Sequence, residues 1–220
     1  MHTFDTPAPV SAILDVPAGR IELVATDRAD TTVEIRPVDA SNRRDVAAAE
    51  RTVVEHRDGT LRVTTPTKHD HLGPSGAVAV TVRLPSGSHL EAQVAAADVR
   101  GSGRLGDVTV EAAQGTITLD EAASARLATP AGDVSVGRLG GAAQVSTAKG
   151  DITVAEAVRG ALTLTTQAGD VSVGAAPGVS ASLDAGTAYG RVSNALVNAG
   201  TVELEIRATT AYGDISARSL

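Results

Sequence analysis

Thr147-Ala-Lys-Gly-Asp-Ile-Thr-Val154 is the clearest copy of a motif that recurs through the second half of the chain. A glycine is followed by aspartate and then by alternating apolar and hydroxyl residues, a period of two that is typical of a strand. Six copies start 17, 18, 19, 21 and 23 residues apart, at Gly115, Gly132, Gly150, Gly169, Gly190 and Gly213. Because a single short repeat cannot bury its apolar face alone, each copy is expected to lie on its neighbours.

The residues around each glycine predict an all-β chain. Two apolar residues follow the glycine two positions apart, as Ile152 and Val154 do, and another strand precedes it. We expect a β-solenoid (a single-stranded β-helix) of stacked coils of about 18–23 residues, with the six glycines along one corner. The chain is 42% hydrophobic but only 1% aromatic, so its core must consist of Val, Ile, Leu and Ala.

Residues 1–90 lack the motif but are also rich in predicted strands. Val10 to Val38 holds three short alternating runs bounded by Pro, Gly or Asp, and Arg57-Asp58-Gly59 separates two further runs as a hairpin turn would. Asn42 to Arg51 is the one stretch with a helical pattern. We therefore divide the chain into an N-terminal β-strand region, 1–90, which supplies early coils or a cap, and a solenoid repeat region, 91–220.

Three motifs point to a known family. They are Val16-Pro-Ala-Gly-Arg-Ile-Glu-Leu-Val24, the strand Val80-Thr-Val-Arg-Leu-Pro-Ser-Gly87 and the Thr-x-x-Gly-Asp-Ile repeat that begins at Thr147. In these residues, over most of its length, the chain resembles the bacterial putative-adhesin family of β-strand-repeat proteins, which is defined as a domain of unknown function. The resemblance implies adhesion but brings no catalytic motif with it.

Composition argues against several classes of function. The chain has no cysteine, which excludes disulfides and thiolate metal sites. Its net charge of −7 comes without a basic stripe, which argues against a nucleic-acid partner. No apolar run approaches the ~18 residues that a membrane span requires. The N-terminus has no basic segment followed by an apolar one, so we expect a cytoplasmic rather than an exported protein.

Few residues are candidates for catalysis. Gly101-Ser-Gly-Arg-Leu-Gly106 matches the dinucleotide-binding pattern, but a predicted strand follows it where a helix would be needed. His69-Asp70-His71 could bind a metal, although a solvated loop is the simpler interpretation. His56 and His89 have no patterned nucleophile partner. We therefore expect no enzyme activity, no cofactor, no metal and no catalytic residue.

The position after the corner glycine is mostly acidic. In the order of the sequence this column contains Thr116, Asp133, Asp151, Asp170, Arg191 and Asp214. Stacking would bring the carboxylates within one strand spacing, which suits a calcium ladder or the acid pair of a glycoside hydrolase. We favour a turn role, in which each aspartate accepts local backbone N–H groups. Arg191 is expected between Asp170 and Asp214, where it would compensate charge.

Two tyrosines mark a possible contact surface. Tyr189 and Tyr212 occur in identical Thr-Ala-Tyr-Gly contexts 23 residues apart, so we expect them to stack in adjacent coils. One interpretation is an aromatic platform for a sugar or a peptide. The other, which we favour, is mutual packing over a corner.

Three functions fit these observations. The first is a non-enzymatic scaffold or binding module, adhesin-like, for an unknown protein or polymer partner. The second is a self-assembling structural protein of the bactofilin type, because the last coil, Thr209 to Leu220, has no evident cap and is expected to expose Ile215 at an open edge for end-to-end homo-association. The third is a carbohydrate-active β-helix enzyme, which the scarce aromatics disfavour.

Overall fold

The computed structural model describes residues 1–66 and 76–220 and shows an all-β protein. The described residues form seventeen strands and one helix. They divide into two compact units, Met1–Gly115 and Thr116–Leu220, called unit 1 and unit 2 below. The division suggested by the sequence, at residue 90, falls at the start of a strand inside unit 1. No helix in the described part of the chain is long and apolar enough to cross a bilayer.

Unit 1 is built around two long strands that each turn a corner. Its elements are β1 (His2–Asp5), β2 (Ser11–Thr26), β3 (Asp30–Pro37), α1 (Arg43–Arg51), β4 (Val53–Arg57), β5 (Thr60–Thr64), β6 (Val78–Pro85) and β7 (His89–Gln114). The first half of β2 pairs in parallel with β5 and its second half with β6. On its other side β2 pairs in parallel with β7 along almost its whole length. β2 therefore lies between segments that follow it in the sequence.

Antiparallel strands cover one end of unit 1. β3 pairs antiparallel with β6, β4 with β5, and β1 with β3. The expected hairpin between β4 and β5 is present, with positive φ angles at Asp58 (50°) and Gly59 (73°). The expected helix is α1, capped by the side chain of Asn42. The buried carboxylate of Asp45 fixes this helix by accepting N–H groups from Asp39 and Ala77 at 3.1 and 3.0 Å.

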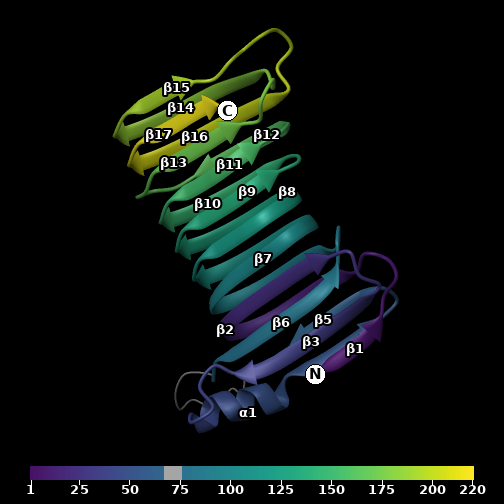
Figure 1. Cartoon of the computed structure of the whole chain (residues 1–220). Coiled ribbons are helices and arrows are strands. Elements are labelled where there is room, and N and C mark those ends of the chain that lie inside the picture. Colours follow the sequence, from purple (N-terminus) through teal and green to yellow (C-terminus); the bar gives the residue numbers. More distant parts are fainter. Residues whose placement is uncertain (67–75) are drawn as a thin grey trace. The chain divides into compact units, whose positions relative to one another are not determined.

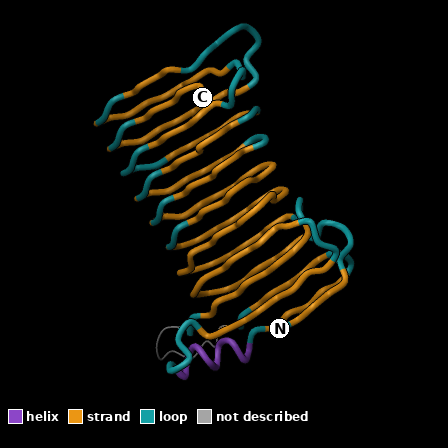
Figure 2. The backbone as a smooth tube through the Cα atoms, viewed as in Figure 1, coloured by secondary structure: helices purple, strands orange, loops and turns teal. Residues whose placement is uncertain are grey.

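Unit 2 consists of two rows of parallel strands. Its elements are β8 (Ile117–Ala131), β9 (Val134–Leu139), β10 (Ala143–Lys149), β11 (Ile152–Ala157), β12 (Gly160–Thr165), β13 (Val171–Ala175), β14 (Ala181–Tyr189), β15 (Val192–Ala195), β16 (Leu204–Tyr212) and β17 (Ile215–Ser219). One row runs β8-β10-β12-β16-β14. The other runs β8-β9-β11-β13-β17-β15, because β8 turns a corner and contributes to both rows. Within unit 2 these strands lie side by side (Figure 1), joined by short loops and by one longer loop, residues 196–203 (Figure 2).

The last strands of unit 2 are inserted out of sequence order. β16 lies between β12 and β14, and β17 lies between β13 and β15. The expectation that Thr209 to Leu220 forms an open end with an exposed Ile215 is therefore wrong, because Ile215 is 1% exposed between two neighbouring strands. Residues 196–203 make this possible, since they carry the chain back past the repeat that precedes them.

Alternation along each strand builds the core of unit 2. Ile152 pairs with Val134 on one side and Val171 on the other, and all three are buried. The row that contains β10 and β12 supplies a paired column of Leu127, Val145, Leu164 and Ala208 in the same way. Small aliphatic side chains fill the space between the two rows, as the near absence of aromatic residues requires.

Candidate functional site

The corner glycines of unit 2 stack directly on one another. A Cβ atom on Gly150 would lie 2.2 Å from the carbonyl oxygen of Gly132, and one on Gly169 would lie 2.0 Å from that of Gly150. The same contact joins Gly213 to Gly169 (2.0 Å) and Gly190 to Gly213 (1.9 Å). The spatial order is thus 132, 150, 169, 213, 190. Gly115, the sixth glycine, belongs to unit 1, where its Cβ would meet the carbonyl oxygen of Ala97 at 2.1 Å.

Threonine hydroxyls form hydrogen bonds between neighbouring corners. At four of the glycines, the threonine three residues before the glycine donates its hydroxyl to the carbonyl of the glycine in the neighbouring repeat, whereas Thr129, before Gly132, donates to the carbonyl of Ala131. Thr147 donates to Gly132, Thr166 to Gly150, Thr210 to Gly169 and Thr187 to Gly213, at 3.0–3.2 Å. A glycine carbonyl at this corner therefore has a side-chain donor that the sequence motif supplies once per repeat.

The aspartates form a second ladder beside the threonines. Oδ1 of Asp133 accepts the backbone N–H of Asp151 at 2.9 Å, Asp151 accepts that of Asp170 at 2.8 Å, and Asp170 accepts that of Asp214 at 2.7 Å. The partner is the next repeat rather than the local turn, so the expected turn role needs this correction. Among the described residues no group of three or more His, Cys, Asp or Glu side chains is placed to hold a metal ion.

Arg191 terminates the aspartate ladder. The expectation that it lies between Asp170 and Asp214 is wrong, because these two aspartates are direct neighbours. Arg191 lies beyond Asp214 and donates to it through its backbone N–H at 2.9 Å and its guanidinium at 3.1 Å. The backbone hydrogen bond and then the side-chain one hold the pKa of Asp214 below its usual value. The side chain of Arg191 remains 89% exposed.

The two tyrosines do stack. Tyr189 and Tyr212 are paired residues of β14 and β16, and their rings lie 5.0 Å apart between centroids with 4° between their planes. Both rings are largely exposed, at 69% and 60%. They continue an outward column in which each residue precedes a corner glycine: Ala131, Lys149, Ala168, Tyr212 and Tyr189. β14 is the last strand of its row, so among the described residues no strand lies beyond Tyr189.

The repeat formed by β14 and β15 has an edge that sequence reasoning missed. Within the described part of the chain β14 pairs only with β16, and β15 only with β17. Val192 is 47% exposed although it occupies the same core column as Ile215. A signal existed: this copy reads Gly-Arg-Val-Ser-Asn, with Arg191 in place of aspartate and Asn194 at an apolar position, and terminal repeats are often atypical. We call this edge, with Tyr189, the end surface.

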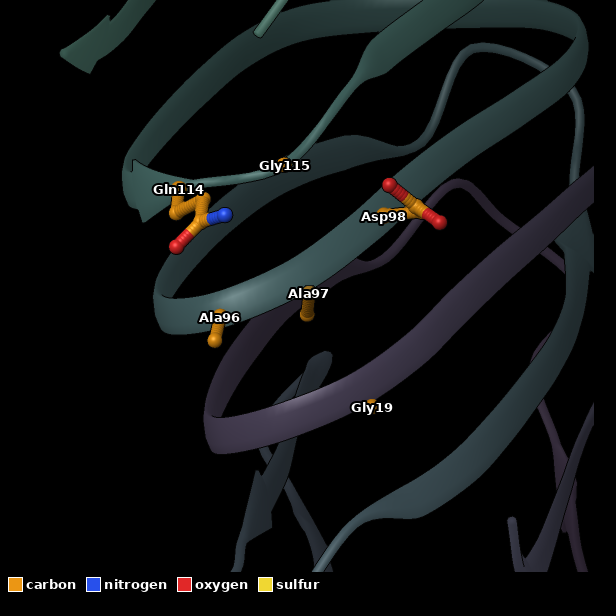
Figure 3. Close-up of a pocket in the computed structure, with 6 residues that line it drawn as sticks. All are labelled: Gly19, Ala96, Ala97, Asp98, Gln114 and Gly115. Atoms are coloured by element: carbon orange, nitrogen blue, oxygen red, sulfur yellow. The ribbon is translucent and has the colours of Figure 1, made fainter. Parts of the chain in front are cut away.

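Unit 1 carries a small hollow at a corner of its own. It has a volume of about 240 Å³ and is lined by Gly19, Ala96, Ala97, Asp98, Gln114 and Gly115. Figure 3 shows that Asp98 and Gln114 bring the polar side chains to a site otherwise formed by glycine and alanine. One carboxylate and one amide can hydrogen-bond a ligand, but these six residues supply no pair of groups for acid–base catalysis.

The glycine pattern and the histidines singled out from the sequence are the remaining candidates. Gly101 to Gly106 lies within β7, so no helix N-terminus follows the glycine pattern. Nδ1 of His89 accepts the backbone N–H of Asp107 at 3.0 Å. His56 contacts the ring of Phe4, with centroids 5.2 Å apart. His69-Asp70-His71 lies outside the described residues.

Stacked strands with glycine corners define an all-β repeat protein, and comparison with known families identifies which one. The model described as Toastrack DUF4097 matches residues 14–219, so the chain belongs to this family, which confirms the family resemblance drawn from its motifs. No curated protein matches the chain.

Solved structures that resemble the chain include two proteins described as putative adhesins. The one from Parabacteroides distasonis has a TM-score of 0.49 at 12% identity, and the one from Bacteroides fragilis 0.48 at 11%; each match covers 98% of this chain and 95% of that one. A putative cell adhesion protein from Clostridium sporogenes has a TM-score of 0.37 at 10% identity, over 100% of this chain and 98% of that one.

Proposed function

We propose that the chain is a non-enzymatic scaffold or binding module of the adhesin type, built as a β-solenoid whose coils carry one glycine corner each. The parallel pairing of strands 18 and 19 residues apart supports this architecture. The observation that carries the binding function is the stacked, exposed pair Tyr189 and Tyr212 beside the end surface. Its partner is a protein segment or a polymer.

The tyrosine pair has the chemistry of a recognition platform. The rings are already stacked, so a ligand meets an ordered apolar face, and little side-chain entropy is lost on binding. Each phenol adds a hydroxyl group that can donate or accept a hydrogen bond. Arg191 lies two residues after Tyr189 and Asp214 two residues after Tyr212, and both add charged groups nearby. A sugar ring, or an aromatic or proline side chain of a peptide, suits such a surface.

The hydrogen bonds of the corner carboxylates favour a structural role for these groups over a catalytic one. In the sequence they are the best candidates for a pair of glycosidase acids, which must be free to exchange protons with a substrate. In the structure Asp133, Asp151 and Asp170 each accept the backbone N–H of the following repeat. Their role is therefore the docking of one repeat on the next. The comparisons lend no support to an assembly of the bactofilin type.

Binding to a glycan microarray and to a peptide array tests the proposal. Tyr189→Ser should reduce binding of the best ligand at least tenfold, since it removes the outermost ring, and Tyr189→Phe should retain most of it. Tyr212→Ser should have a smaller effect, because that ring is covered by Tyr189. Thr153→Ala, on an exposed face of the same unit, is the matched control. Unchanged binding by Tyr189→Ser would refute the platform.

A further inference from the structure

We propose that the end surface pairs with the end surface of a second copy of the chain, giving a two-fold symmetric dimer in which β14 and β15 each meet their own counterpart. The inference goes beyond ligand recognition by the tyrosines and does not depend on it. It rests on the unpaired edges of both strands, on the apolar column between them and on the charges at the two corners.

The backbone of the end surface has one unpaired edge on each of its two strands. β14 and β15 each have one partner strand among the described residues, whereas β12, β13, β16 and β17 each have two. Residues 196–203 contact the beginning of β14, where Ala181 donates its N–H to the carbonyl of Val197 at 3.0 Å. The edge beyond it contains neither proline nor lysine, the residues that commonly block an exposed edge.

Apolar side chains between the two edges are exposed at positions where the neighbouring repeat has buried core residues. Val192 is 47% exposed, while its partner Ile215 is 1% exposed. Leu183 is half-buried, while its partner Ile206 is 1% exposed. Val197, in the loop that follows, is 56% exposed. Another layer of strands would bury these side chains in the way each interior repeat buries those of its neighbour.

A second copy fits this surface because the partner must offer two strand edges with an apolar column between them. A single peptide strand could satisfy β14 or β15 but not both rows. The end of unit 1 is a poorer partner, since its edge strands β1 and β4 span four and five residues against nine in β14, and β4 carries Glu55 and Arg57. The contact between Phe4 and His56 also joins these two strands. The matching surface is therefore the end surface itself, which implies two-fold symmetry.

The charges at the corners agree with this symmetry. A two-fold axis through the middle of β14 reverses the strand, so the Gly190 corner of one copy meets the Ser180 corner of the other. The first corner carries Arg191, whose side chain is 89% exposed. The second carries the exposed Glu203, which donates its N–H to Ser180 at 2.9 Å. Opposite charges thus face each other twice.

Strand lengths predict a weak dimer. The two edges span nine and four residues, fewer than the roughly 20–30 residues that each partner contributes to a standard interface. Sedimentation of the full chain over a wide concentration range should therefore show a monomer at low concentration and a growing fraction of dimer, with no larger species, at high concentration. A two-fold contact uses up the surface, so assembly stops at two copies.

Val192→Lys provides the decisive variant, because it places a charge in the exposed apolar column. We expect it to weaken dimerisation at least tenfold. Val53→Lys is the matched control: Val53 is 48% exposed on the edge strand β4 of unit 1, and dimerisation should be unchanged. A wild-type chain that stays monomeric throughout, or equal loss in both variants, would overturn the proposal. Species larger than the dimer would also overturn it, since they indicate head-to-tail stacking.

Single cysteines test the antiparallel geometry, and the absence of native cysteine makes the result direct. Asp184→Cys, Gly186→Cys and Ala188→Cys place thiols along β14, and at least one must lie within a residue of the two-fold axis. That variant should form a disulfide-linked dimer on mild oxidation, whereas Val53→Cys should not. If none of the three cross-links, the two-fold pairing is wrong. Ligand binding by monomeric Val192→Lys would show that the tyrosine platform survives on its own.

Discussion

The glycine corner predicts a large and specific cost for one added methyl group. In Gly169→Ala the new Cβ would lie 2.0 Å from the carbonyl oxygen of Gly150, and the backbone φ of +154° is one that side chains rarely adopt. An ordinary contact needs about 3.4 Å, so the two repeats would have to separate by more than 1 Å. At Gly169, as at Gly150 and Gly213, both steric effects therefore act together.

The cost can be worked out from the contacts at this corner. A residue with this φ loses about 1–2 kcal/mol of backbone energy. Separation of the repeats also breaks the hydrogen bond from Thr166 to Gly150 (3.0 Å) and the one from Asp170 to Asp151 (2.8 Å). At about 1 kcal/mol each, these bring the total to about 3–4 kcal/mol. For a chain of this size the melting temperature should fall by roughly 10 °C.

Three other glycines of unit 2 separate the contributions. Gly178 has a φ of +80° but open space around its Cβ position, so Gly178→Ala should show backbone strain alone. Gly174→Ala should show the contact alone, because its Cβ would lie 2.2 Å from the carbonyl oxygen of Ala155 without a positive φ. Gly186 has neither feature, and Gly186→Ala should be neutral or slightly stabilising. Urea unfolding followed by circular dichroism measures all four. Equal stability of Gly169→Ala and Gly186→Ala would refute the reasoning.

Three further predictions concern the interior and the two ladders. Ile152→Asp should cost roughly 3–5 kcal/mol of folding stability because it buries an unpaired charge. Asp151→Asn should be nearly neutral because the amide oxygen can still accept the N–H of Asp170. Equal losses of melting temperature in the two variants would contradict this. Thr166→Val should cost about 1 kcal/mol through its lost bond to Gly150, and the exposed Thr163→Val little, both in urea unfolding. Arg191 lowers the pKa of Asp214, so this carboxylate stabilises the fold above its unfolded pKa of about 3.9 and ceases to do so as the pH falls through the lower folded value. The stability difference between wild type and Asp214→Asn should therefore be present at pH 7 and vanish near pH 2, and a difference that does not change with pH would refute it.

Local chemistry made the strands and corners predictable. Alternation placed Ile152, Val134 and Val171 in one buried column before any pairing was known, and the structure aligns them in that register. The hairpin at Asp58 and Gly59 and the helix capped by Asn42 were equally accessible, because their signals lie within a few residues of the elements. Such features depend on backbone geometry and side-chain period, which a single sequence contains.

The order in which the repeats stack was harder to predict, because the equivalent apolar residues of different repeats can replace one another as neighbours. Ile206 meets Leu162 on one side and Leu183 on the other, and either aliphatic neighbour would suit any position in the stack. For the same reason the partner of each aspartate was misjudged: a local N–H and that of the next repeat are chemically identical. The atypical copy that contains Arg191 and Asn194 was the available sign that this repeat, not the last one, occupies the end.

The inserted strands make the end surface depend on the C-terminal residues. β14 and β15 make no strand pairs with β12 or β13 and are held to the rest of unit 2 through β16 and β17. Pairs such as Leu162 with Ile206 lie 44 residues apart in the chain, against 18 for Val134 with Ile152. Closing such a loop costs more entropy than adding the next repeat in order, so β16 and β17 should dock late in folding. The tyrosine pair has the same dependence, because Tyr212 comes from β16 and Tyr189 from β14. The surface that we assign to partners is thus assembled by the last segment of the chain.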